Sequence, residues 1–338
     1  MACLRNGYPI GMATIHERFD LAKWVSEFPL AAERKRIREW VDKCDRENPK
    51  AYPNEQSKLD HIKLMEPDGD IVVGPRELAF NEQLRAECGG LSGAVSTVPV
   101  DVLVWAEGEP SNRAATKIGG TPYRPRGAEW PRNQDGDPCE FLGQMCFADS
   151  RDILTTLNGK RLELPGDILL LFNTALGGLF DSDEEDPRSL QYEWQPLGLS
   201  DLMEPQSLPA PFSDSAISPC HAQLHRTVDL SSVPQDHPLR SFESGASLAV
   251  FKSGKIAGLP HYVQDAEPRP GVFLGAFGSI NPVGPTFPLL NVPVNPSGEF
   301  NMNGNYCMFG DCGSLYLFLE QPHGKRGPSV LHWTVQCY

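Results

Sequence analysis

The hexapeptide KIGGTP at residues 117–122 recurs with two changes as KIAGLP at residues 255–260. Two more matches follow in the same order: FLG at 141–143 with FLG at 273–275, and GDILLLF at 166–172 with GSLYLF at 313–318. A strand-like apolar run precedes the first match each time, VLVW at 102–105 and LAVF at 248–251. Four features in one order indicate an internal repeat, in which two small β-rich units pack around one core.

The longer stretch KIGGTPYRPRGAEWP, residues 117–131, has the glycines and the positive charge of a phosphate-binding loop. A phosphate loop needs several backbone N–H groups that converge at the start of a helix. Here the two adjacent glycines are followed by prolines, which lack an N–H and hinder helix formation. Together with the recurrence, this favours a structural turn over a phosphate site.

Glycine and proline, at 31 residues each, approach a fifth of the 338-residue chain. The usual share is about 12%, and an excess of these residues favours short elements and many turns. Apolar runs predict strands at 98–105, 168–172, 248–251 and 314–320. The segment from 181 to about 245 is predicted to form long surface connections.

The N-terminal part has a different pattern. In LAAERKRIREWVDKCDRE, residues 30–47, helical spacing aligns Leu30, Ile37, Trp40, Val41 and Cys44. We expect helix over about 15–50, ending at Asn48-Pro49, and a further short helix over 75–90.

The predicted fold class is therefore α+β, with a helical N-terminal region followed by a β-rich, pseudo-duplicated core of two halves. The expected domains are 1–95 for the helical region and 96–338 for the core. Within the core, 96–200 is the first half, 201–245 a connection, and 246–338 the second half.

Motifs for nucleophilic, metal or deaminase chemistry are absent: GxSxG, HExxH and HxE…PCxxC do not occur. Cys220, His221 and His225 could supply metal ligands, but no second paired cluster accompanies them. Cys307, with Asp311 nearby, could be a nucleophile, although a structural cysteine is the more common case. We expect no catalytic residue, no metal and no cofactor.

Nine cysteines without a CxxC pair predict free, mostly buried thiols. The N-terminus lacks the apolar stretch of a secretory signal, and no run of about 18 apolar residues occurs. These features predict a cytoplasmic protein.

The net charge is −14. Proteins that coat nucleic acids usually present a basic face, so direct nucleic-acid binding is disfavoured, whereas a basic protein partner is favoured. Five carboxylates lie within six positions, at Asp181, Asp183, Glu184, Glu185 and Asp186. This run is either a self-repelling surface loop or a phosphate mimic that contacts a partner. Tyr123, Trp130 and Trp194 are either core residues or partner anchors.

Several motifs together resemble the YwqG-like family: KIGGTP at 117–122, PRGAEWP at 125–131, PCEFLGQ at 138–144, LPGDILLLF at 164–172, KIAGLPHYVQ at 255–264 and GDCGSLYLF at 310–318. The resemblance covers about residues 96–320, with Ala257 where glycine is usual. That family is bacterial and of unknown function, with no agreed catalytic residues. Some members adjoin toxin genes and are thought to be immunity proteins.

The resemblance and the acidity favour an immunity protein that binds and neutralises a cognate, basic, nuclease-type toxin. The alternative is an enzyme of unknown reaction with a cleft between the two halves. A general adaptor with several weak partners is a third hypothesis.

Overall fold

The structure is a computed structural model of the 338-residue chain. It describes residues 4–5, 8–9, 14–27, 30–65, 78–79, 81–82, 85–86, 96–156, 159–174, 189–209, 217–232, 250–251, 254–267, 269–280, 307–310, 313–322 and 327–337.

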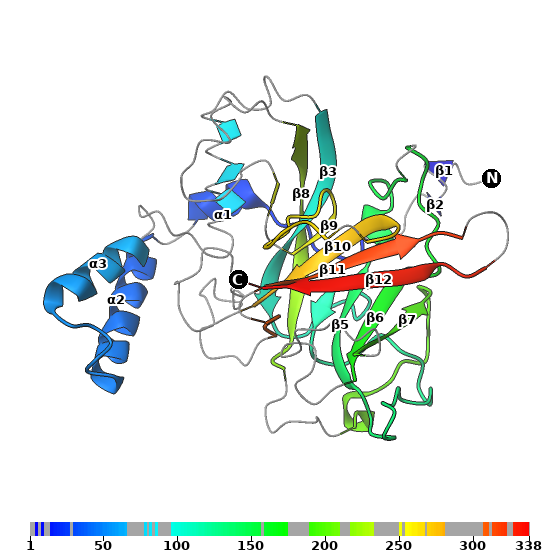
Figure 1. Ribbon diagram of the computed structural model, residues 1–338, viewed down its shortest axis with the longest axis horizontal. Helices are drawn as coiled ribbons and strands as arrows, with labels where there is room; N and C mark the ends of the chain where they lie inside the picture. Colours follow the sequence, from blue (N-terminus) through cyan, green and yellow to red (C-terminus); the bar gives the residue numbers. More distant parts are fainter. Residues whose placement is uncertain are drawn as a thin grey trace.

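Ten strands form one antiparallel sheet in the order β12-β11-β10-β9-β3-β8-β4-β5-β6-β7, which is curled upon itself (Figure 1). The strands are β3 (Ser96–Glu107), β4 (Lys117–Ile118), β5 (Glu140–Cys146), β6 (Ile168–Asn173), β7 (Leu190–Gln195), β8 (Cys220–Ser232), β9 (Lys255–Ala257), β10 (Val272–Gly278), β11 (Ser314–Glu320) and β12 (Val330–Gln336). The short strands β1 (Leu4–Arg5) and β2 (Tyr8–Pro9) pair separately. Short 3-10 helices, η1 and η2, cover Ala148–Ser150 and Pro205–Ser207.

The sheet has two wings that face each other. We call β4–β7 the first wing and β9–β12 the second wing. The main apolar cluster contains residues of both, including Leu169 and Leu171 from β6 and Leu315 and Leu317 from β11. The curled sheet therefore buries its concave face against itself, and helices are not needed to cover that face.

Strand β6 shows why some runs are apolar throughout. Leu169 and Leu171 face the main cluster, whereas Ile168, Leu170 and Phe172 face a second cluster on the outer side of the first wing. Loop residues 197–202 and Trp130 cover that outer cluster. Both faces of the strand are thus buried, so the usual alternation of polar and apolar residues is lost.

The two copies of the repeat share detailed geometry. In both FLG segments the leucine forms a β-bulge, so that Phe141 pairs with Phe172 and Phe273 with Phe318. A Cβ on Gly143 would lie 2.7 Å from the Lys117 carbonyl oxygen, and one on Gly275 would lie 2.3 Å from that of Lys255. Each FLG glycine is thus required by the close approach of the Lys-Ile strand.

The first strands of the two halves, β3 and β8, are exchanged, so that each pairs with strands of the other half. β3 pairs with β8 along its whole length and with β9, while β8 pairs with β3 and β4. Among the named strands, each of these two therefore pairs only with strands of the other half. The strand that corresponds to β3 is β8, and not the run at 248–251, whose described residues 250–251 are not in a strand.

A pseudo-two-fold axis follows from the register. Lys117 lies opposite His221 and Lys255 opposite Val102, which makes Val102 the counterpart of His221. Val104 and Gln223 are then counterparts, and they also pair with each other. The axis therefore passes through this pair, at the centre of the sheet.

The expected α+β class with a helical region over 1–95 is wrong, because the chain is mostly antiparallel β. The described helices are α1 (Leu21–Glu27), α2 (Leu30–Glu47) and α3 (Glu55–Met65), with helical residues also at 78–79, 81–82 and 85–86. Residues 14–20 are not helical and run along the sheet. None of the described helices is both long and apolar enough to cross a membrane.

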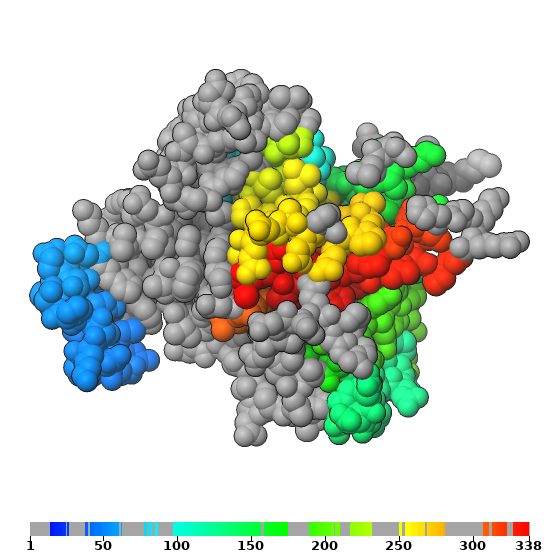
Figure 2. All heavy atoms as spheres, in the orientation of Figure 1, coloured from blue at the N-terminus to red at the C-terminus, as the bar shows by residue number. Residues whose placement is uncertain are grey.

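Helix α2 confirms the predicted helix over 30–47. Val41, which is fully buried, packs with Tyr52 and Ile62 and so joins α2 to α3. Lys58 of α3 binds Asp42 and Asp45 at 2.8 and 3.0 Å. In Figure 2 the two helices form a lobe at the left edge of the molecule.

Of the ten strands of the sheet, β3, β6 and β11 were predicted and the other seven were missed. In β8, buried and more exposed residues alternate: Cys220, Ala222 and Leu224 are buried, with His221, Gln223 and His225 between them. β8 lies within the segment that was expected to be a connection, 201–245, and is instead central to the sheet. The histidines and the glutamine between the buried residues made the alternation of this strand hard to recognise in the sequence.

Candidate functional site

The repeated Lys-Ile motif builds two ion pairs of buried lysines rather than a ligand loop. The Lys117 Nζ lies 2.7 Å from Glu109 Oε2, and the Lys255 Nζ lies 2.9 Å from Asp229 Oδ2. Each carboxylate also accepts the backbone N–H four residues after its lysine, from Thr121 and from Leu259. Burial lowers the pKa of both ammonium groups, against the opposing effect of the paired carboxylates.

The positive φ angles explain the glycines of the motif. Gly119 and Gly120 have φ of 66° and 71°, and Ala257 and Gly258 have φ of 60° and 74°. The turn thus places an alanine in the left-handed region, which disfavours residues with a Cβ. The motif is architectural, as its recurrence predicted.

A pocket of about 1000 Å³ lies beside β8. Its walls come from the N-terminal segment 18–22, from Ala79 and Glu82, and from residues 225–227 of β8. The pocket therefore joins segments that are about 200 positions apart in the chain, which no local motif could reveal.

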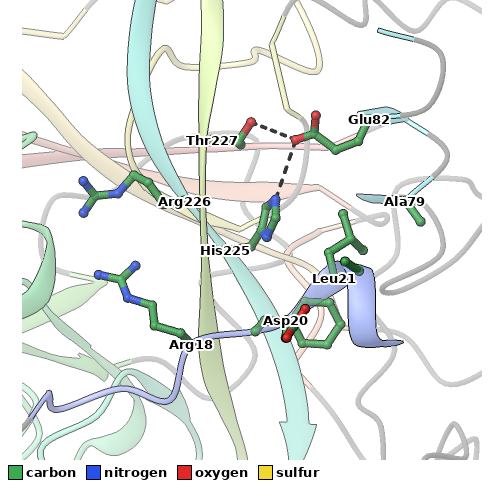
Figure 3. A pocket seen from close by; sticks show the side chains of 10 residues that line it. Arg18, Asp20, Leu21, Ala79, Glu82, His225, Arg226 and Thr227 are labelled. Carbon is green, nitrogen blue, oxygen red and sulfur yellow. Dashed lines mark hydrogen bonds and ion pairs between the residues drawn. The ribbon is translucent and has the colours of Figure 1, made fainter. Parts of the chain in front are cut away.

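The polar groups of the pocket fall into two sets. Figure 3 shows the side chains of Arg18 and Arg226 extending together on one side of β8, and Glu82 with His225 and Thr227 on the other. The Thr227 hydroxyl donates to Glu82 Oε1 at 2.8 Å, and His225 Nε2 lies 3.6 Å from the same oxygen. Burial opposes ionisation of Glu82, but these two hydrogen-bonding partners outweigh it and lower its pKa. The polar groups therefore satisfy each other and do not converge on one point.

The two arginines are held by a buried aspartate. Asp101, whose side chain is fully buried, accepts from Arg18 at 2.9 Å and from Arg226 Nε at 2.7 Å. The Ser150 hydroxyl donates to it at 2.6 Å, and Arg226 also binds Asp152 at 2.8 Å. Bidentate pairing of this kind fixes the guanidinium planes. The cluster ties β3, β8, η1 and the N-terminal segment together.

His16 completes a chain of hydrogen bonds that resembles an acid–base relay. Its Nδ1 donates to Asp149 Oδ2 at 2.9 Å, and its Nε2 lies 2.9 Å from the Thr116 hydroxyl. However, Nε2 also accepts the backbone N–H of Thr116, at 2.9 Å. With its lone pair used and both His16 and Thr116 buried, the imidazole has no capacity to activate the hydroxyl.

Acid is expected to lower the unfolding free energy by protonating Asp149. Burial alone would raise the pKa of this carboxyl, but hydrogen bonds from the ring and backbone of His16 leave it below the ordinary value. A lowered pKa stabilises the fold above the unfolded pKa of about 3.9, and that stability is lost as pH falls through the folded pKa. We expect Asp149→Asn to flatten the decline of unfolding free energy between about pH 5 and pH 2. Urea titrations at each pH measure the unfolding free energy, and Asp135→Asn, at an exposed position, is the control. Equal slopes of unfolding free energy against pH in the two variants would contradict the role of Asp149.

The predicted partner-binding residues Asp181, Asp183, Glu184, Glu185 and Asp186 lie outside the described residues, as does Asp311. His221 and His225, weighed as metal ligands, lie on β8. His221 Nδ1 lies 2.9 Å from the Gly108 carbonyl oxygen. Among the described residues, no group of three or more His, Cys, Asp or Glu could hold a metal ion.

The cysteines in the described ranges are buried for the most part: Cys139, Cys146, Cys220 and Cys307 are buried, and Cys44 and Cys337 are partly exposed. Burial raises the pKa of the Cys146 thiol to about 12 and raises those of Cys220 and Cys307 as well. A thiol that stays protonated is a poor nucleophile. Cys307 is therefore a structural residue.

Of the aromatic residues weighed as partner anchors, Tyr123 is buried, whereas Trp130 and Trp194 are half-buried and pack against the apolar clusters. Tyr123 is buried, and its hydroxyl accepts the Leu199 N–H at 3.0 Å. The Trp130 indole donates to the Cys139 carbonyl at 2.7 Å, and Trp194 packs on Phe147 with ring centroids 5.8 Å apart. These contacts stabilise the first wing.

Comparison with known proteins gives one family match, which lies in the first wing. Residues 116–195, from β4 to β7, match the family model described as a domain of unknown function, DUF1963. No curated protein matches the chain. The match covers residues 116–195 of the 338-residue chain, and the family of that model is the YwqG-like family of unknown function that the motifs resemble.

Proposed function

We propose that this protein binds and neutralises a basic protein, a cognate toxin of the nuclease type, through an acidic outer surface. The observation that carries the proposal is the distribution of charge between inside and outside. Four cations are buried among the described residues, Arg85, Lys117, Arg124 and Lys255, against two carboxylates, Asp101 and Asp229. The remaining side chains therefore have a net charge more negative than the −14 of the whole chain.

The chemistry of the pocket agrees with a binding role. Its carboxylate, imidazole and guanidinium groups are paired internally, and the nearby His16 has no free lone pair. An acidic surface accelerates capture of a basic partner, because long-range attraction raises the association rate. Members of the resembled family that adjoin toxin genes support the toxin as partner.

Co-expression tests the proposal directly. The full chain is produced together with the product of the adjacent gene, and growth and co-purification are measured. We expect rescue of growth and a stable complex. If the product of the adjacent gene is harmless when expressed alone, the proposed immunity function is wrong. If the adjacent genes form a metabolic operon, the enzyme alternative is favoured.

The acidic run at 181–186 provides a sharper test. We expect replacement of its five carboxylates by Asn, Gln or Ser to slow association on the order of tenfold at low salt, with less effect at high salt. Stopped-flow or surface-binding kinetics measure the rate. The matched control removes five exposed carboxylates elsewhere: Glu55, Asp135, Asp137, Glu163 and Asp265. An equal loss in both variants would mean that net charge acts, and an unchanged rate would remove the run from the interface.

A further inference from the structure

The centre of the sheet contains a strand position that a remote segment fills. β4 pairs with β8 only at Cys220 and His221. Further along β8, the Leu224 N–H donates to the Glu17 carbonyl at 2.9 Å, and the Phe19 N–H donates to the Leu224 carbonyl at 3.0 Å. Leu224 is fully buried, so both of its backbone groups would lack partners without residues 17–19.

The two halves match at the residue before the Lys-Ile strand. The Ala222 N–H donates to the Thr116 carbonyl at 2.9 Å, and at the counterpart position the Leu103 N–H donates to the Gly254 carbonyl at 2.8 Å. In the first half the chain before Thr116 turns away, with the Ala115 N–H donating to the Asn112 carbonyl at 3.0 Å. The position beside Leu224 is consequently left to a segment about 100 residues upstream of β4.

The segment is held as a peptide ligand is held. Asp149 Oδ2 accepts the backbone N–H groups of Ile15 and His16 at 2.9 and 2.7 Å, besides the His16 ring. Two residues later, Arg18 reaches the buried Asp101. On either side of these anchors, Ile15 packs against the outer cluster of the first wing, and Phe19 packs against Val100 and its neighbours.

The groups that receive the segment are positioned by the sheet itself. Asp101 is bound by Arg226 and by Ser150, which are not part of the segment. The Thr116 hydroxyl, beside the His16 ring, accepts the Cys146 N–H at 2.9 Å. Two fixed carboxylates and a free strand edge select an extended chain that carries a histidine and an arginine two residues apart.

We propose that the edge of β8 at Leu224, with Asp101 and Asp149, is an acceptor site for an extended peptide of the pattern aliphatic-His-x-Arg-aromatic. Residues 15–19 of the chain are its occupant in cis. This site is independent of the toxin-binding surface proposed above, and its test needs no toxin.

The test begins with the full chain, into which a protease site is inserted directly after α1. After cutting, size-exclusion chromatography at micromolar concentration shows whether the N-terminal fragment stays bound, and circular dichroism shows whether the sheet persists. A fluorescent synthetic peptide of residues 14–27 then replaces the fragment, and anisotropy gives its dissociation rate. Asp149→Asn in the protein and His16→Ala in the peptide both remove the bond between Asp149 and the His16 ring. Glu17→Gln in the peptide alters an exposed neighbour whose side chain accepts from Gln223.

We expect the fragment to be retained, and either change of the Asp149–His16 contact to speed dissociation at least about tenfold. The two changes together should have less than the sum of their separate effects, because they share the bond between Asp149 and the His16 ring. Glu17→Gln should change the rate less than about threefold. Loss of the fragment from the cut protein, unfolding on cutting, or an unchanged rate in Asp149→Asn would overturn the proposal. A dimer of the uncut protein that His16→Ala abolishes would place the segment in a neighbouring copy and overturn the occupancy in cis.

Discussion

Replacing Gly258 with alanine is expected to cost at least about 3 kcal/mol of unfolding free energy. A Cβ at this position would lie 2.3 Å from Asp229 Oδ2 and 2.9 Å from Val100 Cβ, on a backbone with φ of 74°. Asp229 has no room to give way, since it accepts from Phe251, Lys255 and Leu259. Urea denaturation followed by tryptophan fluorescence measures the loss.

Three matched variants separate the clash from the backbone strain. Gly127→Ala has φ of 76° and open space around the new Cβ, so it should cost only about 1 kcal/mol. Gly120→Ala should be intermediate, because its nearest neighbour, Glu109, is 39% exposed and can swing outward. Ala257→Gly should stay within about 1 kcal/mol of wild type, since relief of strain offsets the loss of a buried methyl group. Equal costs for Gly258→Ala and Gly127→Ala would contradict the packing argument.

The second large effect concerns the two halves of the chain. Fragments that divide it between η2 and β8 should each fail to fold alone and should form the native sheet together. The reason is that β3 pairs only with β8 and β9, and β8 only with β3 and β4 among the named strands. Each fragment would thus lack every strand partner of its own first strand, and the main core would be divided as well.

Separate expression, mixing and circular dichroism measure this, with size-exclusion chromatography of the mixture. The control is the intact chain cut at the same place, which should remain one particle with the native spectrum. Cooperative unfolding of either fragment by itself would show that one half can form its own core. The prediction that each half needs the other to fold would then be wrong.

The sequence allowed the repeated turns to be predicted because their geometry constrains residue type. The motif glycines at 119, 120, 143, 258 and 275 stand where φ is positive or where a Cβ would meet backbone or a buried side chain. Strands β6 and β11 were equally evident, since burial of both faces makes them apolar throughout. Such features are local, and a single sequence contains them.

What sequence reasoning missed was non-local. The helical pattern of α2 was extended to a whole N-terminal region, although residues 14–20 follow the edge of β8. β8 itself was hidden, because histidine and glutamine alternate with its short run of buried residues and an arginine follows that run. The pocket and the contacts of Asp149 with His16 join segments more than 130 positions apart, and neither spacing nor composition specifies such pairing.

The exchange of β3 and β8 also bears on the origin and symmetry of the molecule. A lone half has no partner for its first strand, whereas two identical halves would complete one another as a two-fold homodimer. Once two copies are fused into one chain, their sequences can diverge from each other. The two copies of the motif have since diverged, because Lys255 pairs with a fully buried Asp229 and Lys117 with a partly exposed Glu109.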